Sequence, residues 1–197
     1  MSDETIAAVE QWRELATQYS GGTPVAEMLA LIHRLSAGDP LAANGAGASG
    51  LTLIHEDTAR SLGVEPAALA DPATAIATAA ELLQQHRQRI EAALSQAGRW
   101  DISDGEILPL VLAAYWFGPR DILSAIELGA GPREVFSQLT ERGPEMRAFA
   151  DSVLSLVPVY QREAGQLTGP AMARRNWFGV GLAVALVGLG GYALIRR

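Results

Sequence analysis

The sequence predicts an all-α domain followed by one C-terminal transmembrane helix. Three observations support this. The hydrophobic fraction is 49% but aromatic residues make up only 6%, which favours close-packed helices over sheets. Apolar residues recur at helical spacing in the longest segments. Residues 177–195 contain no charged side chain. The chain has 197 residues, which suits one domain of typical size plus an appendage.

In the first half, we expect a helix over residues 6–19 and a second over residues 24–36. Thr23 would cap the second helix and Pro24 would be its first residue, a position where proline is favoured. The segment 39–50 (DPLAANGAGASG) is rich in glycine, alanine and asparagine, so it predicts a loop. A short helix follows at 56–62.

In the second half, Asp71 and Pro72 open a long helix whose apolar stripe runs from Ile76 to Leu94 at helical spacing. Ser103 and Glu106 fit a capping box that begins an apolar helix at 107–117. Glycine and proline then separate further expected helices at 121–128, 133–139 and 144–160. The predicted domain is therefore residues 1–163, joined by a linker at 164–176 to the membrane helix at 177–195.

The expected membrane helix would span roughly 28 Å at 1.5 Å per residue, close to the thickness of a bilayer's hydrocarbon core. Two arginines precede it and two follow it, and Trp177 and Tyr192 lie near the expected interfaces. A buried core helix is the alternative that we disfavour. Because both flanks carry two arginines, the positive-inside rule does not decide the orientation.

Composition excludes several classes of function. The chain has no cysteine, which removes thiolate catalysis and cysteine zinc sites. Residues 1–173 hold all 22 acidic residues and 11 arginines, a net charge of −11, so no nucleic-acid partner is expected. His33, His55 and His86 lack metal-ligand spacing and are expected at the surface or a cleft edge. We predict no metal and no cofactor.

Three blocks of sequence carry a resemblance to a known family. They are residues 30–40 (ALIHRLSAGDP) with 47–51 (GASGL) and 58–59 (TA), then 71–83 beginning with DP, then 113–119 (AAYWFGP) with 144–154 beginning with PE. In order and spacing they resemble the soluble lytic transglycosylase (goose-type lysozyme-like) family. The resemblance implies a lysozyme-like helical fold and a cleft that binds peptidoglycan glycan strands.

The resemblance also implies a mechanism based on one glutamic acid, which protonates the glycosidic oxygen and then takes a proton from the 6-hydroxyl of N-acetylmuramic acid. Leu35 occupies that position, and leucine can neither donate nor accept a proton. Two further polar cleft positions of the family are apolar here, at Leu53 and Trp116. The polar positions expected to remain in the glycan cleft are Ser36, Thr52, Tyr115 and Glu145.

These features predict a catalytically inactive, membrane-anchored protein that binds peptidoglycan or serves as a structural protein of a phage virion membrane. One alternative is an active lytic transglycosylase for cell-wall penetration with a relocated acid, drawn from Glu27, Glu56, Asp57 and Glu106. Another is a helical, membrane-tethered interaction protein. The expected partners are the membrane, glycan strands and other virion or membrane proteins. The expected location is a single-pass anchor in a virion's internal membrane, with a bacterial inner membrane as the alternative.

Overall fold

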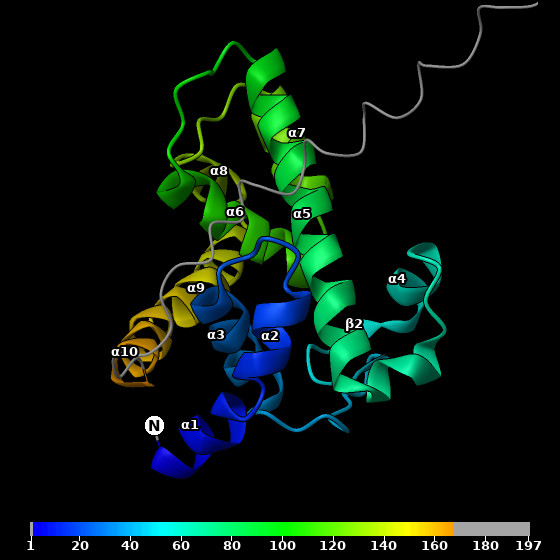
Figure 1. The fold of residues 1–197 in the computed structure, drawn as a ribbon. Helices are drawn as coiled ribbons and strands as arrows, with labels where there is room; N and C mark the ends of the chain where they lie inside the picture. Colours follow the sequence, from blue (N-terminus) through cyan, green and yellow to red (C-terminus); the bar gives the residue numbers. More distant parts are fainter. Residues whose placement is uncertain (1, 168–197) are drawn as a thin grey trace, which may run out of the picture.

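The computed structural model describes residues 2–167, which form an almost entirely helical domain and confirm the predicted all-α class (Figure 1). The helices are α1 Asp3–Glu10, α2 Arg13–Tyr19, α3 Val25–Ser36, α4 Glu56–Ser61, the 3₁₀ helix η1 Pro66–Ala70, α5 Pro72–Gln96, α6 Asp104–Phe117, α7 Arg120–Glu127, α8 Val135–Gln138, α9 Gly143–Leu154 and α10 Val157–Leu167. Within residues 2–167, none of these helices combines the length and apolarity needed to cross a membrane. The expected membrane helix at 177–195 lies outside the described residues.

Helix α3 lies at the centre of the domain. Its consecutive residues 28–32 have no exposed surface, because α1, α2, α9 and α10 pack around it. The long helix α5 packs against α2, α6 and α7, and in Figure 1 it runs down the view between these helices and the region of α4 and β2. Burial of apolar surface in these contacts is the main force that stabilises the arrangement.

The expected single helix at 6–19 is wrong, because the structure breaks it into α1 and α2 at Gln11 and Trp12. The indole N–H of Trp12 donates to the carbonyl of Gly38 at 2.9 Å, just past the end of α3. The Trp12 backbone N–H bonds to Val9 at 3.0 Å in a tighter turn. The bond from Trp12 to Gly38 joins segments that are distant in sequence, and it turns α2 toward the core.

The expected helix at 144–160 also divides, into α9 and α10, next to Pro158. Proline has no backbone N–H, and its ring clashes with the carbonyl four residues earlier, so one continuous helix is disfavoured there. Helix α10 packs on α3 and continues to Leu167, past the expected domain boundary at residue 163.

Helix starts follow the predicted capping signals at two sites. The Asp71 carboxylate accepts the Thr74 N–H at 2.9 Å and begins α5. Ser103 and Glu106 form the expected capping box of α6. The start of α3 is shifted by one residue from the prediction. Pro24 is extended and lies before the first helical residue, Val25.

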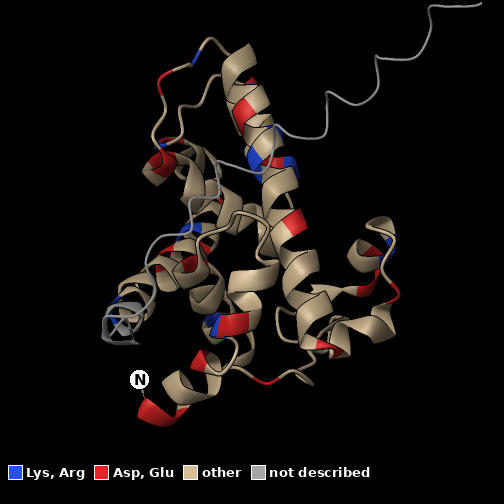
Figure 2. Ribbon diagram, viewed as in Figure 1, with Lys and Arg blue, Asp and Glu red and all other residues tan. Residues whose placement is uncertain are grey.

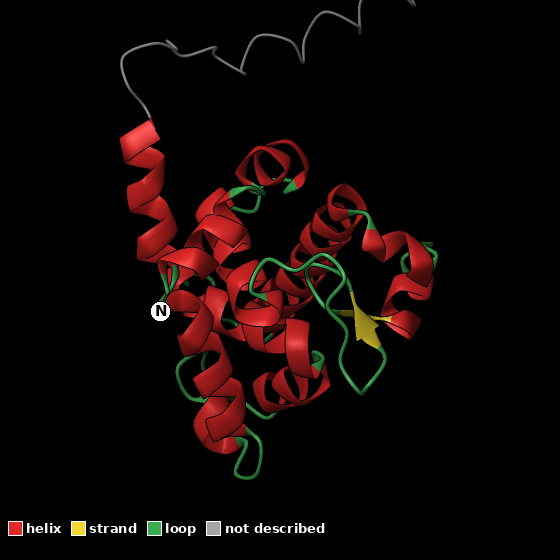
Figure 3. Ribbon diagram, turned by 90° about the horizontal axis from the view of Figure 1, so that it is seen from below, coloured by secondary structure: helices red, strands yellow, loops and turns green. Residues whose placement is uncertain are grey.

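The predicted loop at 39–50 ends in one strand of a small sheet that the sequence analysis did not predict. Strand β1 Ala48–Ser49 pairs antiparallel with β2 Ile54–His55, and they are the only strand segments drawn in Figure 3 for the described part of the chain. The Asn44 side-chain oxygen accepts the N–H groups of Ala46 at 3.0 Å and Ala48 at 2.9 Å. These bonds order a segment whose composition suggested only a loop.

Candidate functional site

A cleft of about 520 Å³ lies between the small sheet, the middle of α5 and the C-terminal end of α6. It is lined by Asn44, Ala46, Ala48, Leu53, Ile54, His55 and Thr58 on the sheet side, by Leu82 and His86 of α5, by residues 114–119 at the end of α6, and by Arg142 before α9. Four segments that are distant in sequence therefore form one cavity.

The wall beside the small sheet depends on a close backbone approach. Gly50 has φ of +83°, and a Cβ added there would lie 2.3 Å from the carbonyl oxygen of Leu69. Leu53, which lines the cleft, has φ of +45°, a left-handed conformation that is costly for a branched side chain. The wall is therefore held in a conformation that the surrounding structure imposes.

Tyr115 connects this wall to α6. Its hydroxyl donates to the backbone carbonyl of Thr52 at 2.8 Å, and burial raises the pKa of Tyr115 above its ordinary value. The hydroxyl of Tyr115 is therefore neutral and already hydrogen-bonded within the protein. The ring lines the cleft with 8% of its surface exposed, so it offers mainly an apolar surface to a ligand.

Aromatic side chains form one end of the cleft. Trp116 stacks on Phe149 with ring centroids 5.6 Å apart and remains 37% exposed. Phe117 meets Phe149 edge-on, and the guanidinium of Arg142 lies 5.4 Å from the centre of the Phe117 ring. A partly exposed aromatic ring, held by its neighbours, can pack against the apolar face of a flat ligand.

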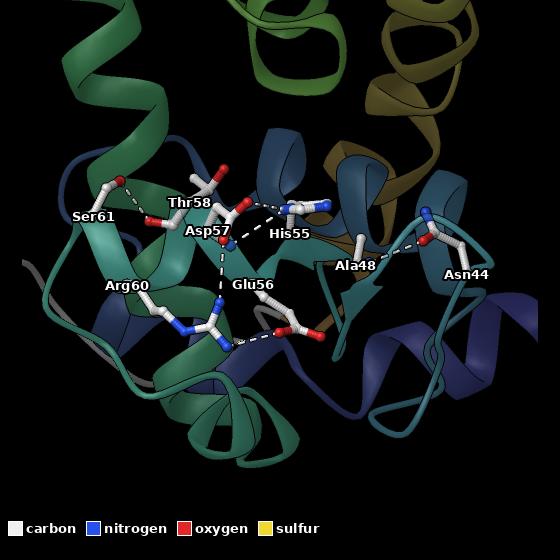
Figure 4. Close-up of polar contacts among 8 residues, drawn as sticks. All are labelled: Asn44, Ala48, His55, Glu56, Asp57, Thr58, Arg60 and Ser61. Atoms are coloured by element: carbon white, nitrogen blue, oxygen red, sulfur yellow. Dashed lines mark hydrogen bonds and ion pairs between the residues drawn. The ribbon is translucent and has the colours of Figure 1, made fainter.

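Among the described residues, 2–167, none of those that line the cleft is Asp or Glu, so this lining offers no carboxyl group. Two acids lie at its rim, but they are paired with Arg60: Glu56 at 2.8 Å and Asp57 at 3.1 Å. Figure 4 shows both carboxylates directed at Arg60, while His55 lies beside Asp57. In a chain this acidic, the cleft is a local exception that bears only neutral or basic groups.

The family model of the transglycosylase SLT domain matches residues 11–131, more than half of the chain. The chain belongs to this SLT family. No curated protein matches it. The matched region runs from the end of α1 through α7 and so contains most of the cleft wall, whereas α8, α9 and α10 lie beyond it. Membership assigns the domain a transglycosylase-like function related to peptidoglycan.

In this SLT domain, Leu35 lies in the last turn of α3, half-buried against the hydrophobic core, and does not line the cleft. Ser36 is beside it, and its hydroxyl donates to the carbonyl of Ile32 at 3.2 Å and accepts the N–H of Gly38 at 3.2 Å. Both residues therefore serve to end α3 and pack it.

The other three predicted cleft residues are dispersed. Thr52 has no exposed surface, and its hydroxyl donates to the carbonyl of Ala75 at 3.1 Å. Glu145 is exposed in the first turn of α9, outside the cleft lining. Of the four polar residues expected there, only Tyr115 lines the cleft.

The structure adds cleft residues that the sequence analysis missed, notably Asn44, His86 and Arg142. The three histidines were expected at the surface or a cleft edge; His86 does line the cleft, but it is buried there with only 5% of its surface exposed. Its position in the stripe of α5, four residues after buried Leu82, was the available signal. Arg142 had no local signal, because α9 brings it to the cleft.

Among the acids considered as substitutes, Glu27 is distinctive. It lines a separate cavity of about 340 Å³ between the start of α3 and the helices α5 and α6. Burial raises the pKa of Glu27, while Arg87 opposes this shift and Asp104 adds to it. Arg87 of α5 pairs with Asp104 at the start of α6 at 2.7 Å, and Figure 2 shows both basic (blue) and acidic (red) positions along α5. Glu106 differs, because its bonds to Ser103 lower its pKa.

Proposed function

We propose that this SLT domain binds peptidoglycan glycan strands without cleaving them. The observation that carries the proposal is the cleft without a carboxyl group, combined with Leu35 at the position of the family's acid. Cleavage of a glycosidic bond needs a group that can transfer protons at the reacting oxygen. The partly aromatic lining, which offers no carboxyl group, suits the packing of a sugar ring far better than it suits that chemistry.

The experiment measures two properties of the full-length chain: binding to purified insoluble peptidoglycan, and release of anhydro-muropeptides from it. We expect binding with no released product. Trp116→Ala should weaken binding by about threefold to tenfold, because it removes the exposed ring at the cleft. Trp100→Ala is the matched control, since Trp100 is 79% exposed and does not line the cleft. Equal effects of the two changes, or no binding at all, would refute the glycan-binding part of the proposal.

Leu35→Glu tests the inactive state. Because Leu35 packs on the core and does not line the cleft, we expect neither this variant nor Leu35→Gln to release product. Release by Leu35→Glu alone would show that position 35 reaches the bound glycan and that only the acid has been lost. Product released by the natural sequence would show that the domain is an active enzyme.

An active transglycosylase with a relocated acid is the second candidate. The observation that favours it is the partly buried position of Glu27 in a cavity of its own. Burial raises its pKa, which is the direction that favours a proton donor, and its cavity could admit a ligand. In that case the natural sequence would release product and Glu27→Gln would abolish the release.

We also propose that residues 177–195 anchor the domain in a membrane, with the internal membrane of a phage virion favoured over a bacterial inner membrane. The charge-free stretch between two pairs of arginines supports the anchor. The full-length chain should float with lipid vesicles after alkaline washing, and the double change Leu186→Asp with Val187→Asp should release it. In intact particles, protease should reach the domain only after the membrane is disrupted. Cleavage in intact particles would count against the internal location.

A further inference from the structure

A second cavity, of about 340 Å³, lies where the turn before α3 meets α5 and α6. It is at the end of α3 away from Leu35, and it shares no lining residue with the cleft beside the small sheet. Much of its wall is apolar, since it includes Leu83 of α5 and Leu108, Val111 and Leu112 of α6. A ligand in this cavity would therefore contact none of the residues that line the cleft.

The polar side of the cavity includes Glu27 and Thr23. Both are half-buried, and within residues 2–167 neither side chain makes a hydrogen bond or an ion pair. Burial raises the pKa of Glu27, because the carboxylate loses hydration there, while the charge of Arg87 opposes this shift. By contrast, Glu145 also lies in the first turn of a helix but is exposed. A half-buried carboxyl group without a hydrogen bond points to a partner that the described residues do not supply.

The charges around the cavity favour a cation as that partner. The carboxyl groups of Glu27 and Asp104 line it together with one guanidinium group, that of Arg87, which leaves an excess of negative charge. Arg87 pairs with Asp104 at 2.7 Å, so its positive charge is already offset. A cationic group in the cavity would pair with Glu27 and stabilise its charged form.

The lining also indicates which cation fits. A metal ion is a poor match, because residues 2–167 contain no group of three side chains that could hold one. Quaternary ammonium groups are usually held by aromatic rings, and none of the described residues that line this cavity is aromatic. A primary ammonium group has three N–H donors, and the side-chain oxygens of Glu27, Thr23 and Gln84 offer acceptors for them. An aliphatic stem would pack against the leucine side chains of the wall.

We propose that the cavity between α3, α5 and α6 binds a primary ammonium group on a short aliphatic chain, with the ammonium group paired to Glu27 and the chain against Leu83 and Leu108. The 197-residue chain contains no lysine, so such a group would come from another molecule. This binding site is independent of the proposed glycan binding, because the cavity and the cleft have no lining residue in common.

The test uses two probes that differ only in the terminal ammonium group, N-acetyl-lysine methylamide and N-acetyl-norleucine methylamide. Their affinities are measured by NMR titration of the isotope-labelled full-length chain in detergent solution. We expect the lysine probe to bind about fivefold to tenfold more tightly and to shift the amide signals of Gly21 and Gly22, which line the cavity. Glu27→Gln keeps the shape of the side chain and removes its charge, so it should abolish this preference.

Glu145→Gln is the matched control, because it removes one negative charge from the first turn of a helix outside the cavity and should leave the preference unchanged. Thermal unfolding at pH 7 checks the fold of Glu27→Gln, which breaks no hydrogen bond within residues 2–167 and should keep its midpoint level or raise it.

Three results would overturn the proposal: equal affinities for the two probes, a preference that survives Glu27→Gln, or signal shifts in the natural protein that spare Gly21 and Gly22. Tighter binding of N-acetyl-arginine methylamide than of the lysine probe would also overturn it, since the cavity would then select a guanidinium group. The glycan-binding measurements on the cleft are unaffected by any of these results.

Discussion

Gly50→Ala should lower the free energy of unfolding by about 3 kcal/mol or more, because two penalties coincide at this position. The backbone has φ of +83°, where L-residues other than glycine are strained. The new Cβ would also lie 2.3 Å from the carbonyl oxygen of Leu69. A backbone oxygen cannot swing aside as a long side chain can, so the segment bearing β1 would have to move away from η1.

The measurement is urea unfolding followed by circular dichroism, with Gly45→Ala as the control. Gly45 lies in the same loop, has no strained φ, and a Cβ there would meet no atom within 4 Å. We expect Gly45→Ala to change the unfolding free energy by less than about 0.5 kcal/mol. Equal stabilities of the two variants would show that the approach of Gly50 to Leu69 is not required by the fold. Because this segment carries the cleft wall, Gly50→Ala should also weaken glycan binding.

The second large effect is a loss of stability in mild acid that depends on His86. Burial lowers the pKa of His86 to about 4 in the folded protein, against 6.5 for the ordinary side chain. Between these values the unfolded chain binds a proton that the folded chain does not, so stability rises with pH through this window. As the pH falls from 7 to 4.5, we expect His86 to contribute a loss of about 2–3 kcal/mol.

The check is a series of unfolding experiments between pH 4.5 and 7 on the natural protein and on His86→Leu. The other titrating groups are common to both proteins, so the difference isolates His86. The variant should gain about 2–3 kcal/mol relative to the natural protein as the pH falls. Parallel pH dependences would contradict the buried, neutral state of His86.

Much of the helical framework could be predicted from local signals. Asp71 and the pair Ser103 and Glu106 begin α5 and α6 because their side chains satisfy N–H groups that every helix leaves unpaired at its start. The break before α10 also had a local signal in Pro158, which the predicted helix overran. By contrast, the break before α2 depends on the bond from Trp12 to Gly38, and no pattern within residues 6–19 reveals that partner.

The candidate site was predicted less completely than the fold. Tyr115 was found because the motif at 113–119 also marks the end of α6, next to the cleft. Thr52 was expected to offer a hydroxyl, but the structure uses that hydroxyl to bond the carbonyl of Ala75. His86 and Arg142 were missed, since their roles depend on where α5 and α9 meet the small sheet.

The sequence by itself determined the helical class and the family resemblance, and it carries the prediction that Leu35 occupies the position of the family's acid, because helix caps, apolar periodicity and motif spacing are properties of neighbouring residues. Only the tertiary structure decided that the described lining of the cleft has no carboxyl group, that Glu27 lies in a separate cavity and that Nδ1 of His86 is buried without a hydrogen-bond partner among residues 2–167. Burial, pairing and pKa depend on which distant segments pack together, and side-chain desolvation has no local sequence signature.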